Sequence, residues 1–227
     1  MTRSTLAAIP RVEPERWEAL CAALRSHATA QMVRVGEQLG ASELSPTEAE
    51  DLVSRDLLLA LDAYAAAGKL LDEARTPPDL AGVHVLLEIA EHRYAAANAR
   101  ARGERAPHFP RRCYENPLHG PAAPESEHPR GGKQRAAKRS AIRGVPMSQV
   151  PLCAACLHRR RAKQTPDSLV TPITVRAKHG HVDGVPVPYY ALPAAQSLWS
   201  ATAFGCLPGS SEADLVARVL RGEYRTA

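Results

Sequence analysis

Residues Leu152–Lys163 read LCAACLHRRRAK, and the pair Cys153 and Cys156 decides how the second half of the chain is interpreted. Two cysteines separated by two residues form half of many metal sites, and they also occur as redox dithiols. Upstream, residues 113–120 read CYENPLHG, which places Cys113 and His119 on one short loop. The sequence therefore offers two separate pairs of thiol and imidazole donors.

Donors arranged as two close-spaced pairs are typical of a structural zinc site, because each pair lies on one tight turn and the turns converge on the ion. Pro117 and Gly120 allow the first of these segments to fold back on itself. Four protein ligands leave no open position, so the binding energy of the ion would contribute to folding. The ligands that we expect for a structural Zn²⁺ are Cys113, His119, Cys153 and Cys156.

Two alternatives to zinc stay open. A redox dithiol needs a βαβ context and a helix that begins at the first cysteine, whereas inert buried thiols need only apolar surroundings. We expect Cys21 and Cys206 to be inert buried thiols, because each lies in an apolar stretch. The histidines that could replace His119 as the fourth ligand are His128, His158, His179 and His181.

Composition divides the chain near residue 103. Residues 1–103 hold 11 Lys and Arg against 15 Asp and Glu, a net charge of −4, and residues 104–227 hold 18 against 9, a net of +9. Alanine and leucine dominate the first part, and seven of the ten aromatic residues follow Pro107. We expect an α+β protein, with a three-helix bundle at 1–103 and a small zinc-stabilised β-rich domain at 104–227, resembling a treble clef or a zinc ribbon.

Three helices are expected in the first part, from apolar residues three and four positions apart. The first begins at Pro14, the second is capped by Ser45 with Glu48 completing a capping box, and Asp79 caps the third. The positions expected on the buried faces are Trp17, Leu20, Leu24, Gln31, Val35 and Leu39, then Leu57, Leu61, Tyr64 and Leu71, then Leu80, Val83, Leu87, Ala90 and Tyr94.

In the second part, a long basic loop at about residues 120–146, which we expect to be mobile, is inserted between the two halves of the predicted metal site. The β-branched residues of the segment 169–190 predict strands, and Asp183-Gly184 predicts a two-residue hairpin turn. Ser211 and Asp214 predict the start of a short C-terminal helix that Gly222 ends. The large residues expected to form the core of this part are Val185, Val187, Tyr190, Trp199 and Phe204.

Basic residues are concentrated between Pro129 and Pro166, a span without any Asp or Glu. Such a cluster would neutralise phosphates and give salt-dependent, largely sequence-independent binding of nucleic acid, although a solvated loop without a partner is an equal alternative. No aromatic residue lies among these cations, so stacking on single-stranded bases is not predicted. The cations are Arg130, Lys133, Arg135, Lys138, Arg139, Arg143, Arg159, Arg160, Arg161 and Lys163.

The segments SEHPRGGKQ (126–134) and LCAACLHRRRAK resemble HNH nucleases. That resemblance implies that Glu127 and His128 hold a catalytic metal, while the C-x-x-C segment with His158 carries a structural zinc. Three features depart from the HNH pattern: His158 lies one residue late, no Asn lies between Gly120 and Pro151, and the Pro-rich run around His128 lacks the residues of a strand.

A wider pattern covers roughly residues 55 to 224. It comprises DLAGVHVLLEIAE, CYENPLHGPA, VPLCAACL, PYYALPAAQSLWSATAFGC and DLVARVLRGEY. It resembles a family of small bacterial proteins without an assigned activity, in which a helical segment precedes a C-x-x-N-P-L-H-G…C-x-x-C unit. The resemblance implies a shared metal-binding fold with the same four ligands.

The expected function is that of a non-catalytic zinc-binding scaffold or interaction protein, with a protein partner of unknown identity. The alternative is an HNH-like nuclease or nucleic-acid-binding module that uses the basic segment 129–166. No nucleophile, base and orienting group follow from spacing alone. Neither an export signal nor an apolar run of about 18 residues is present, so we expect a cytoplasmic protein that does not enter a membrane.

Overall fold

The computed structural model describes residues 12–44, 51–124, 141–142, 145–146, 150–177, 180–207 and 210–225. Its helices are α1 (Pro14–Gly40), α2 (Leu52–Glu73), α3 (Pro77–Ala101), α5 (Ala154–Arg161), α6 (Leu198–Thr202) and α7 (Glu212–Leu220). Three short 3₁₀ segments are η1 (Pro117–His119), η4 (Tyr189–Ala191) and η5 (Ala203–Gly205). The strands are β1 (Ala141–Ile142), β2 (Val145–Pro146), β3 (Val170–Ala177) and β4 (Gly180–Pro188), paired as two small antiparallel sheets.

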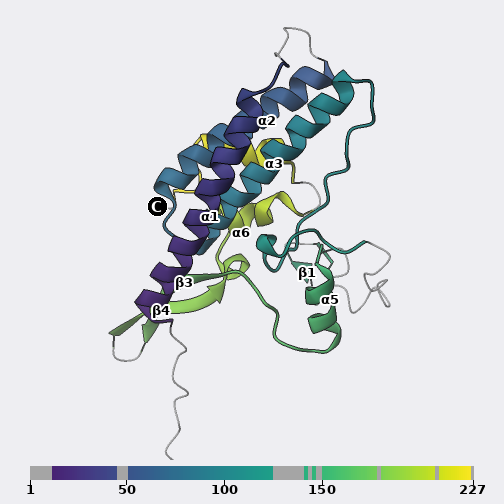
Figure 1. Cartoon of the computed structure of the whole chain (residues 1–227). Coiled ribbons are helices and arrows are strands. Elements are labelled where there is room, and N and C mark those ends of the chain that lie inside the picture. Colours follow the sequence, from purple (N-terminus) through teal and green to yellow (C-terminus); the bar gives the residue numbers. More distant parts are fainter. Residues whose placement is uncertain are drawn as a thin grey trace, which may run out of the picture.

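The described chain is thus rich in α-helix. The long helices α1, α2 and α3 lie side by side, the β3–β4 hairpin lies at the end where α1 begins, and α5 stands to one side (Figure 1). Within the described ranges, no helix combines the length and apolarity that a membrane span needs. The predicted basic loop at 120–146 falls largely outside the described residues, apart from its first residues and the β1–β2 ladder.

Helix starts follow local side-chain chemistry. Asp51 is the N-cap of α2 and accepts a hydrogen bond from the Ser54 amide, while the predicted cap Ser45 and its partner Glu48 lie outside the described residues. Thr76, not Asp79, is the N-cap of α3, and Asp79 instead completes the capping box three residues later. That prediction was wrong because Pro77 and Pro78 start the helix rather than separate two helices.

Alanine faces bring the helices together. Ala60, Ala63 and Ala67 of α2 are fully buried, and so are Ala81 and Ala90 of α3. The expected leucine faces were partly wrong: Leu20 is 41% exposed and Leu61 is 40% exposed. The prediction was confirmed for Leu57 of α2 and for Leu80 and Leu87 of α3, which are buried beside the alanines. Small side chains between such residues allow a close approach between helices.

The segment 169–190 forms the predicted hairpin, β3–β4, but the predicted turn residues lie within a strand. Asp183 and Gly184 lie inside β4, where they face Thr174 as a bulge between the pairs Ile173–Val185 and Val175–Val182. Gly184 has φ +74°, and the Thr174 hydroxyl donates to Asp183 at 2.6 Å. A bulge and a hairpin turn both favour glycine at positive φ, so an Asp-Gly pair alone does not distinguish the two.

The main core is shared by both parts of the chain. Leu198, Trp199 and Phe204 join the residues of α2 and α3 in one buried cluster, as do Leu215 and Val219 of α7. Arg93 of α3 forms ion pairs with Asp56 of α2 at 2.9 Å and with Glu212 of α7 at 2.7 Å. The C-terminal elements are therefore packed onto the helices, and the division at residue 103 stays a prediction about independent folding.

Gly82 marks the closest approach between α3 and α6. A Cβ atom at Gly82 would lie 2.7 Å from Cζ2 of Trp199. The indole is held in place, because its Nε1 donates to Asp79 at 2.8 Å and its ring stacks on Phe204 at 5.0 Å. A side chain at position 82 would therefore displace an indole that is fixed by two contacts.

We predict that Gly82→Ala lowers the free energy of unfolding by about 1–3 kcal/mol, because overpacking displaces the Trp199 ring. Gly40→Ala is the control, since no atom lies within 4 Å of the added Cβ, and we expect it to be neutral or to stabilise by up to about 1 kcal/mol. Urea unfolding of both variants measures the difference. Equal effects of the two substitutions would contradict the packing argument.

Candidate metal centre

The first pair of candidate ligands lies on a loop that closes on itself. Arg112 and Pro121 form an antiparallel bridge, and the Cys113 amide donates to the Gly120 carbonyl at 3.3 Å. Asn116 caps η1 by accepting from the Leu118 amide at 3.0 Å. Gly120 has φ +81°, a conformation that glycine adopts without steric cost. This geometry places Cys113 and His119 on the same side of the loop.

The second pair lies at the start of α5. Cys153 is the N-cap, and its Sγ accepts from the Cys156 amide at 3.5 Å. The residues just before it lie along the first loop, because the Tyr114 amide donates to the Pro151 carbonyl and the Ala123 amide to the Leu152 carbonyl, both at 2.8 Å. Backbone hydrogen bonds thus hold the two ligand-bearing segments side by side.

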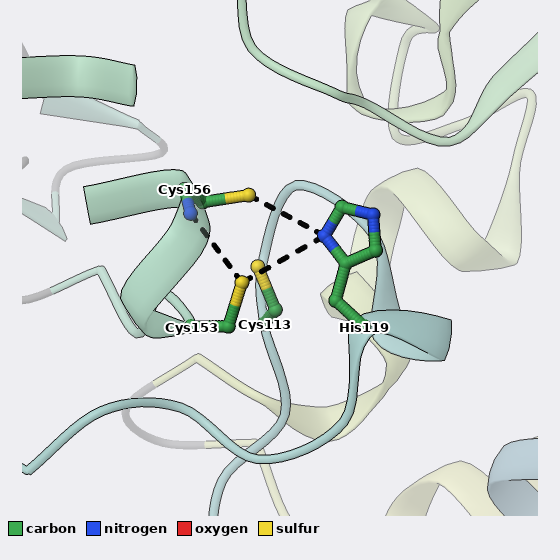
Figure 2. Close-up of side chains that lie close together, drawn as sticks. All are labelled: Cys113, His119, Cys153 and Cys156. Carbon is green, nitrogen blue, oxygen red and sulfur yellow. Dashed lines mark hydrogen bonds between the residues drawn. The ribbon is translucent and has the colours of Figure 1, made fainter. Parts of the chain in front are cut away.

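The four side chains converge on one point (Figure 2). One donor atom from each of Cys113, His119, Cys153 and Cys156 lies within 4.8 Å of all the others. His119 Nδ1 is 3.4 Å from Cys156 Sγ and 3.8 Å from Cys153 Sγ. The structure therefore brings together all four residues that the sequence singled out.

The donor set fits a tetrahedral ion. With bonds of about 2.3 Å to sulfur and about 2.1 Å to nitrogen, tetrahedral zinc separates its donors by about 3.5–3.8 Å. The second ring nitrogen of His119, Nε2, lies 3.5 Å from the Asp167 carboxylate. A carboxylate on the far nitrogen is the usual way in which a protein orients a metal-binding histidine.

Without a cation, the surroundings favour neutral thiols in this cluster. Burial raises the pKa of the Cys113 thiol, and burial together with the nearby Cys113 and Cys153 raises the pKa of Cys156. A bound cation reverses this effect, because a coordinating thiol is deprotonated by the ion itself. The three buried thiols and the imidazole are therefore a candidate metal site.

The alternatives left open by the sequence are unequally supported. Cys153 does begin a helix, as a redox dithiol would need, but the described strands form only small antiparallel sheets and no βαβ unit. Reactive cysteines have a lowered pKa, the opposite of Cys113 and Cys156. Inert packing describes Cys206, which is buried, whereas Cys21 is only partly buried, contrary to expectation.

The other candidate histidines that the structure describes lie outside the cluster of Cys113, His119, Cys153 and Cys156. His158 is exposed on α5 and His181 is exposed on β4, and neither belongs to the cluster. His128 and His179 lie outside the described residues. Of the histidines that the structure describes, His119 is the one that lies with the three cysteines.

A polar cluster beside the ligands was missed at the sequence level. Glu115, two residues after Cys113, is buried and accepts from Ser168 Oγ at 2.6 Å and from the Tyr190 hydroxyl at 2.8 Å. Burial raises the pKa of Tyr190 to about 12, so its hydroxyl stays a donor. No spacing rule joins residues 115, 168 and 190; the only signal was a carboxylate between two candidate ligands.

The basic residues separate into distinct groups. Arg159, Arg161 and Lys163 are exposed, but Arg160 is half-buried, with Nη2 4.0 Å from the Glu115 carboxylate. The remaining six predicted cations, Arg130, Lys133, Arg135, Lys138, Arg139 and Arg143, lie where neither backbone nor side chain is described. Arg160 is therefore less exposed than its neighbours and lies near Glu115.

Comparisons with known proteins add no assignment. No family model matches the chain, and neither a curated protein nor a solved structure matches it. The resemblances drawn from the C-x-x-N-P-L-H-G segment and from the HNH-like segment stay predictions.

Tyr189 provides a direct test of how the loop is held. Its buried hydroxyl donates to the Tyr114 carbonyl at 2.7 Å. We predict that Tyr189→Phe lowers the free energy of unfolding by about 1–3 kcal/mol, because it leaves that buried carbonyl without its donor. The control is Tyr224→Phe. The Tyr224 hydroxyl donates to Glu73 at 3.0 Å near the surface, where water can replace the lost hydrogen bond. Urea unfolding that shows the control to be as damaging would contradict the role given to Tyr189.

Proposed function

We propose that the chain binds one structural Zn²⁺ through Cys113, His119, Cys153 and Cys156, and that it acts as a non-catalytic scaffold or interaction protein. The observation that carries the proposal is the convergence of four protein donors within 4.8 Å of one another. Four protein ligands leave no position for water or substrate, which is the arrangement of structural rather than catalytic zinc. When bound, the ion would cross-link the loop that carries Cys113 and His119 to the start of α5.

Thiolate chemistry supports zinc over other divalent ions. Cysteine and histidine are the ligands of structural zinc sites, whereas Mg²⁺ and Ca²⁺ take oxygen ligands. Two ligands at the first turn of α5 and two on a loop favour a treble-clef-like site over a zinc ribbon. The family resemblance of CYENPLHG and LCAACL points to the same four ligands.

The size of the core around the site supports a structural role. The cluster contains ten buried residues, four of which are Cys113, Cys153, Cys156 and Cys206. Its larger apolar members are few: Tyr114, Val150, Leu152, Leu157 and Leu207. Small cores of this kind usually require a metal or a disulfide for stability, and binding energy at such a site is folding energy.

We predict about one zinc ion per chain in protein purified without added metal, as measured by mass spectrometry of the metals. Cys153→Ser should remove the zinc and make residues 111–161 sensitive to limited proteolysis. The matched control is Cys206→Ala, a buried cysteine of the same core that is not among the four ligands. It should keep the zinc. The proposal would be refuted if the wild-type protein contains no metal and the wild-type protein and the Cys153→Ser variant are equally well folded.

Nucleic-acid binding is the second candidate, favoured by the exposure of Arg159, Arg161 and Lys163 around the end of α5. On this proposal the metal centre holds α5 in place, and the cations around the end of α5 contact phosphates. The nuclease form of the proposal needs a second, open metal site that includes His128. That residue lies outside the described part, and within that part no second cluster of three or more ligating side chains occurs.

We predict that Arg159→Gln/Arg161→Gln reduces by about 2 the slope of log affinity against log salt for a DNA duplex, because two phosphate contacts are lost. Fluorescence anisotropy measures the slope, and Arg16→Gln, an exposed arginine on α1, serves as the control. Wild-type protein without measurable affinity would exclude this candidate. Metal-dependent cleavage that His128→Ala abolishes would favour the nuclease form.

A further inference from the structure

The imidazole of His119 has a different partner on each side of its ring. Nδ1 is turned toward the thiols, 3.4 Å from Cys156 Sγ and 3.8 Å from Cys153 Sγ, as Figure 2 shows. Nε2 lies 3.5 Å from the Asp167 carboxylate. A neutral imidazole that binds a cation through Nδ1 carries its proton on Nε2, and a carboxylate there can accept a hydrogen bond from it. The two partners therefore favour the same orientation of the ring.

Asp167 is placed beside the ring by the residues that follow it in the chain, and not by its own burial. Its side chain is 63% exposed. The next residue, Ser168, donates from Oγ to the Glu115 carboxylate at 2.6 Å, and the Leu169 amide donates to the Glu115 carbonyl at 2.8 Å. These two hydrogen bonds fix the backbone next to Asp167, which lowers the conformational entropy that the contact with the ring has to overcome.

The segment 167–169 therefore supports the metal loop from outside. It contacts the loop at two points, the ring of His119 and both the carboxylate and the carbonyl of Glu115. The segment leads into β3, and just after β4 the Tyr189 amide donates to the Leu169 carbonyl at 2.9 Å. The root of the β3–β4 hairpin thus holds the loop in place, although it provides none of the four donors.

We propose that Asp167 is a positioning residue of the metal centre: its carboxylate accepts from the Nε2–H of His119, directs Nδ1 toward the three thiols and strengthens retention of the ion. This inference deepens the proposed function and rests on it, because it requires the bound ion. It also gives a role to a segment far from both ligand pairs in the sequence.

The test compares the full-length wild type with Asp167→Ala and Asp167→Asn, and zinc affinity is measured by competition with a chromophoric chelator. Groups that hydrogen-bond to a metal-binding histidine typically contribute about 10–100-fold to metal affinity. Because 3.5 Å is longer than an ideal hydrogen bond, we expect a loss of about tenfold for Asp167→Ala, at the lower end of that range. Asp167→Asn keeps an oxygen acceptor and should lose less. The control, Asp62→Ala, removes an exposed aspartate of α2 and should match the wild type.

A double-mutant cycle separates an effect on the imidazole from a general effect on folding. His119→Cys replaces the ring by a thiolate ligand, and four cysteines are also a common zinc-binding set. In the His119→Cys background Asp167→Ala should cost no affinity, because the carboxylate has no second ring nitrogen to bind. A purely structural role of Asp167 would produce the same loss in both backgrounds.

Wild-type affinity of Asp167→Ala, an equal loss in Asp62→Ala, or an equal loss in the His119→Cys background would overturn the inference. If His119→Cys does not bind zinc, the asparagine variant decides: a smaller loss in Asp167→Asn than in Asp167→Ala supports the inference, and equal losses overturn it. Failure of Asp167→Ala to fold with excess zinc would also overturn it, because a positioning residue is not needed for folding. A wild-type chain that binds no zinc would instead refute the proposed function, and this inference with it.

Discussion

The convergence of three thiols and one imidazole is the constraint around which the two ligand-bearing segments are arranged. Cys113 and His119 approach from a closed loop and Cys153 and Cys156 from the first turn of α5, and the four donor atoms lie within 4.8 Å of one another. Without an ion, burial raises the pKa of Cys113 and Cys156 and favours neutral thiols. Neutral thiols repel one another little, but they do not link the two ligand-bearing segments. With an ion, the same atoms would cross-link two segments that share only a small apolar core.

Buried aromatic residues connect the candidate metal loop to the long helices. Tyr189 donates to the backbone of Tyr114 beside Cys113, and its ring meets Phe204 edge to face at 5.0 Å. Phe204 stacks in turn on Trp199, whose indole donates to Asp79 at the start of α3. The candidate metal loop and the N-terminus of α3 are thereby joined through buried contacts, although the two lie far apart in sequence.

Local signals predicted local structure well. Ser211 caps α7, the strands of the β3–β4 hairpin follow β-branched residues, and the glycine at position 222 follows the end of α7 at φ +79°. Where two local outcomes share one requirement, the sequence could not separate them. Gly184 lies in a bulge rather than in a turn, and Leu20 of α1 and Leu61 of α2 are exposed because the packing between helices, and not periodicity alone, selects which residues are buried.

The sequence by itself determined which residues are able to bind a metal, because donor chemistry and short spacing are written in CYENPLHG and LCAACL. Tertiary structure alone decided that these pairs meet, since their approach depends on hydrogen bonds between the Tyr114 and Ala123 amides and the Pro151 and Leu152 carbonyls. It also decided that Ser168, Tyr190 and Arg160 gather around Glu115, because residues so far apart along the chain become neighbours only when the fold closes. Charge can be counted from a sequence, but the direction in which an arginine points is fixed by the helix face and by what packs against it.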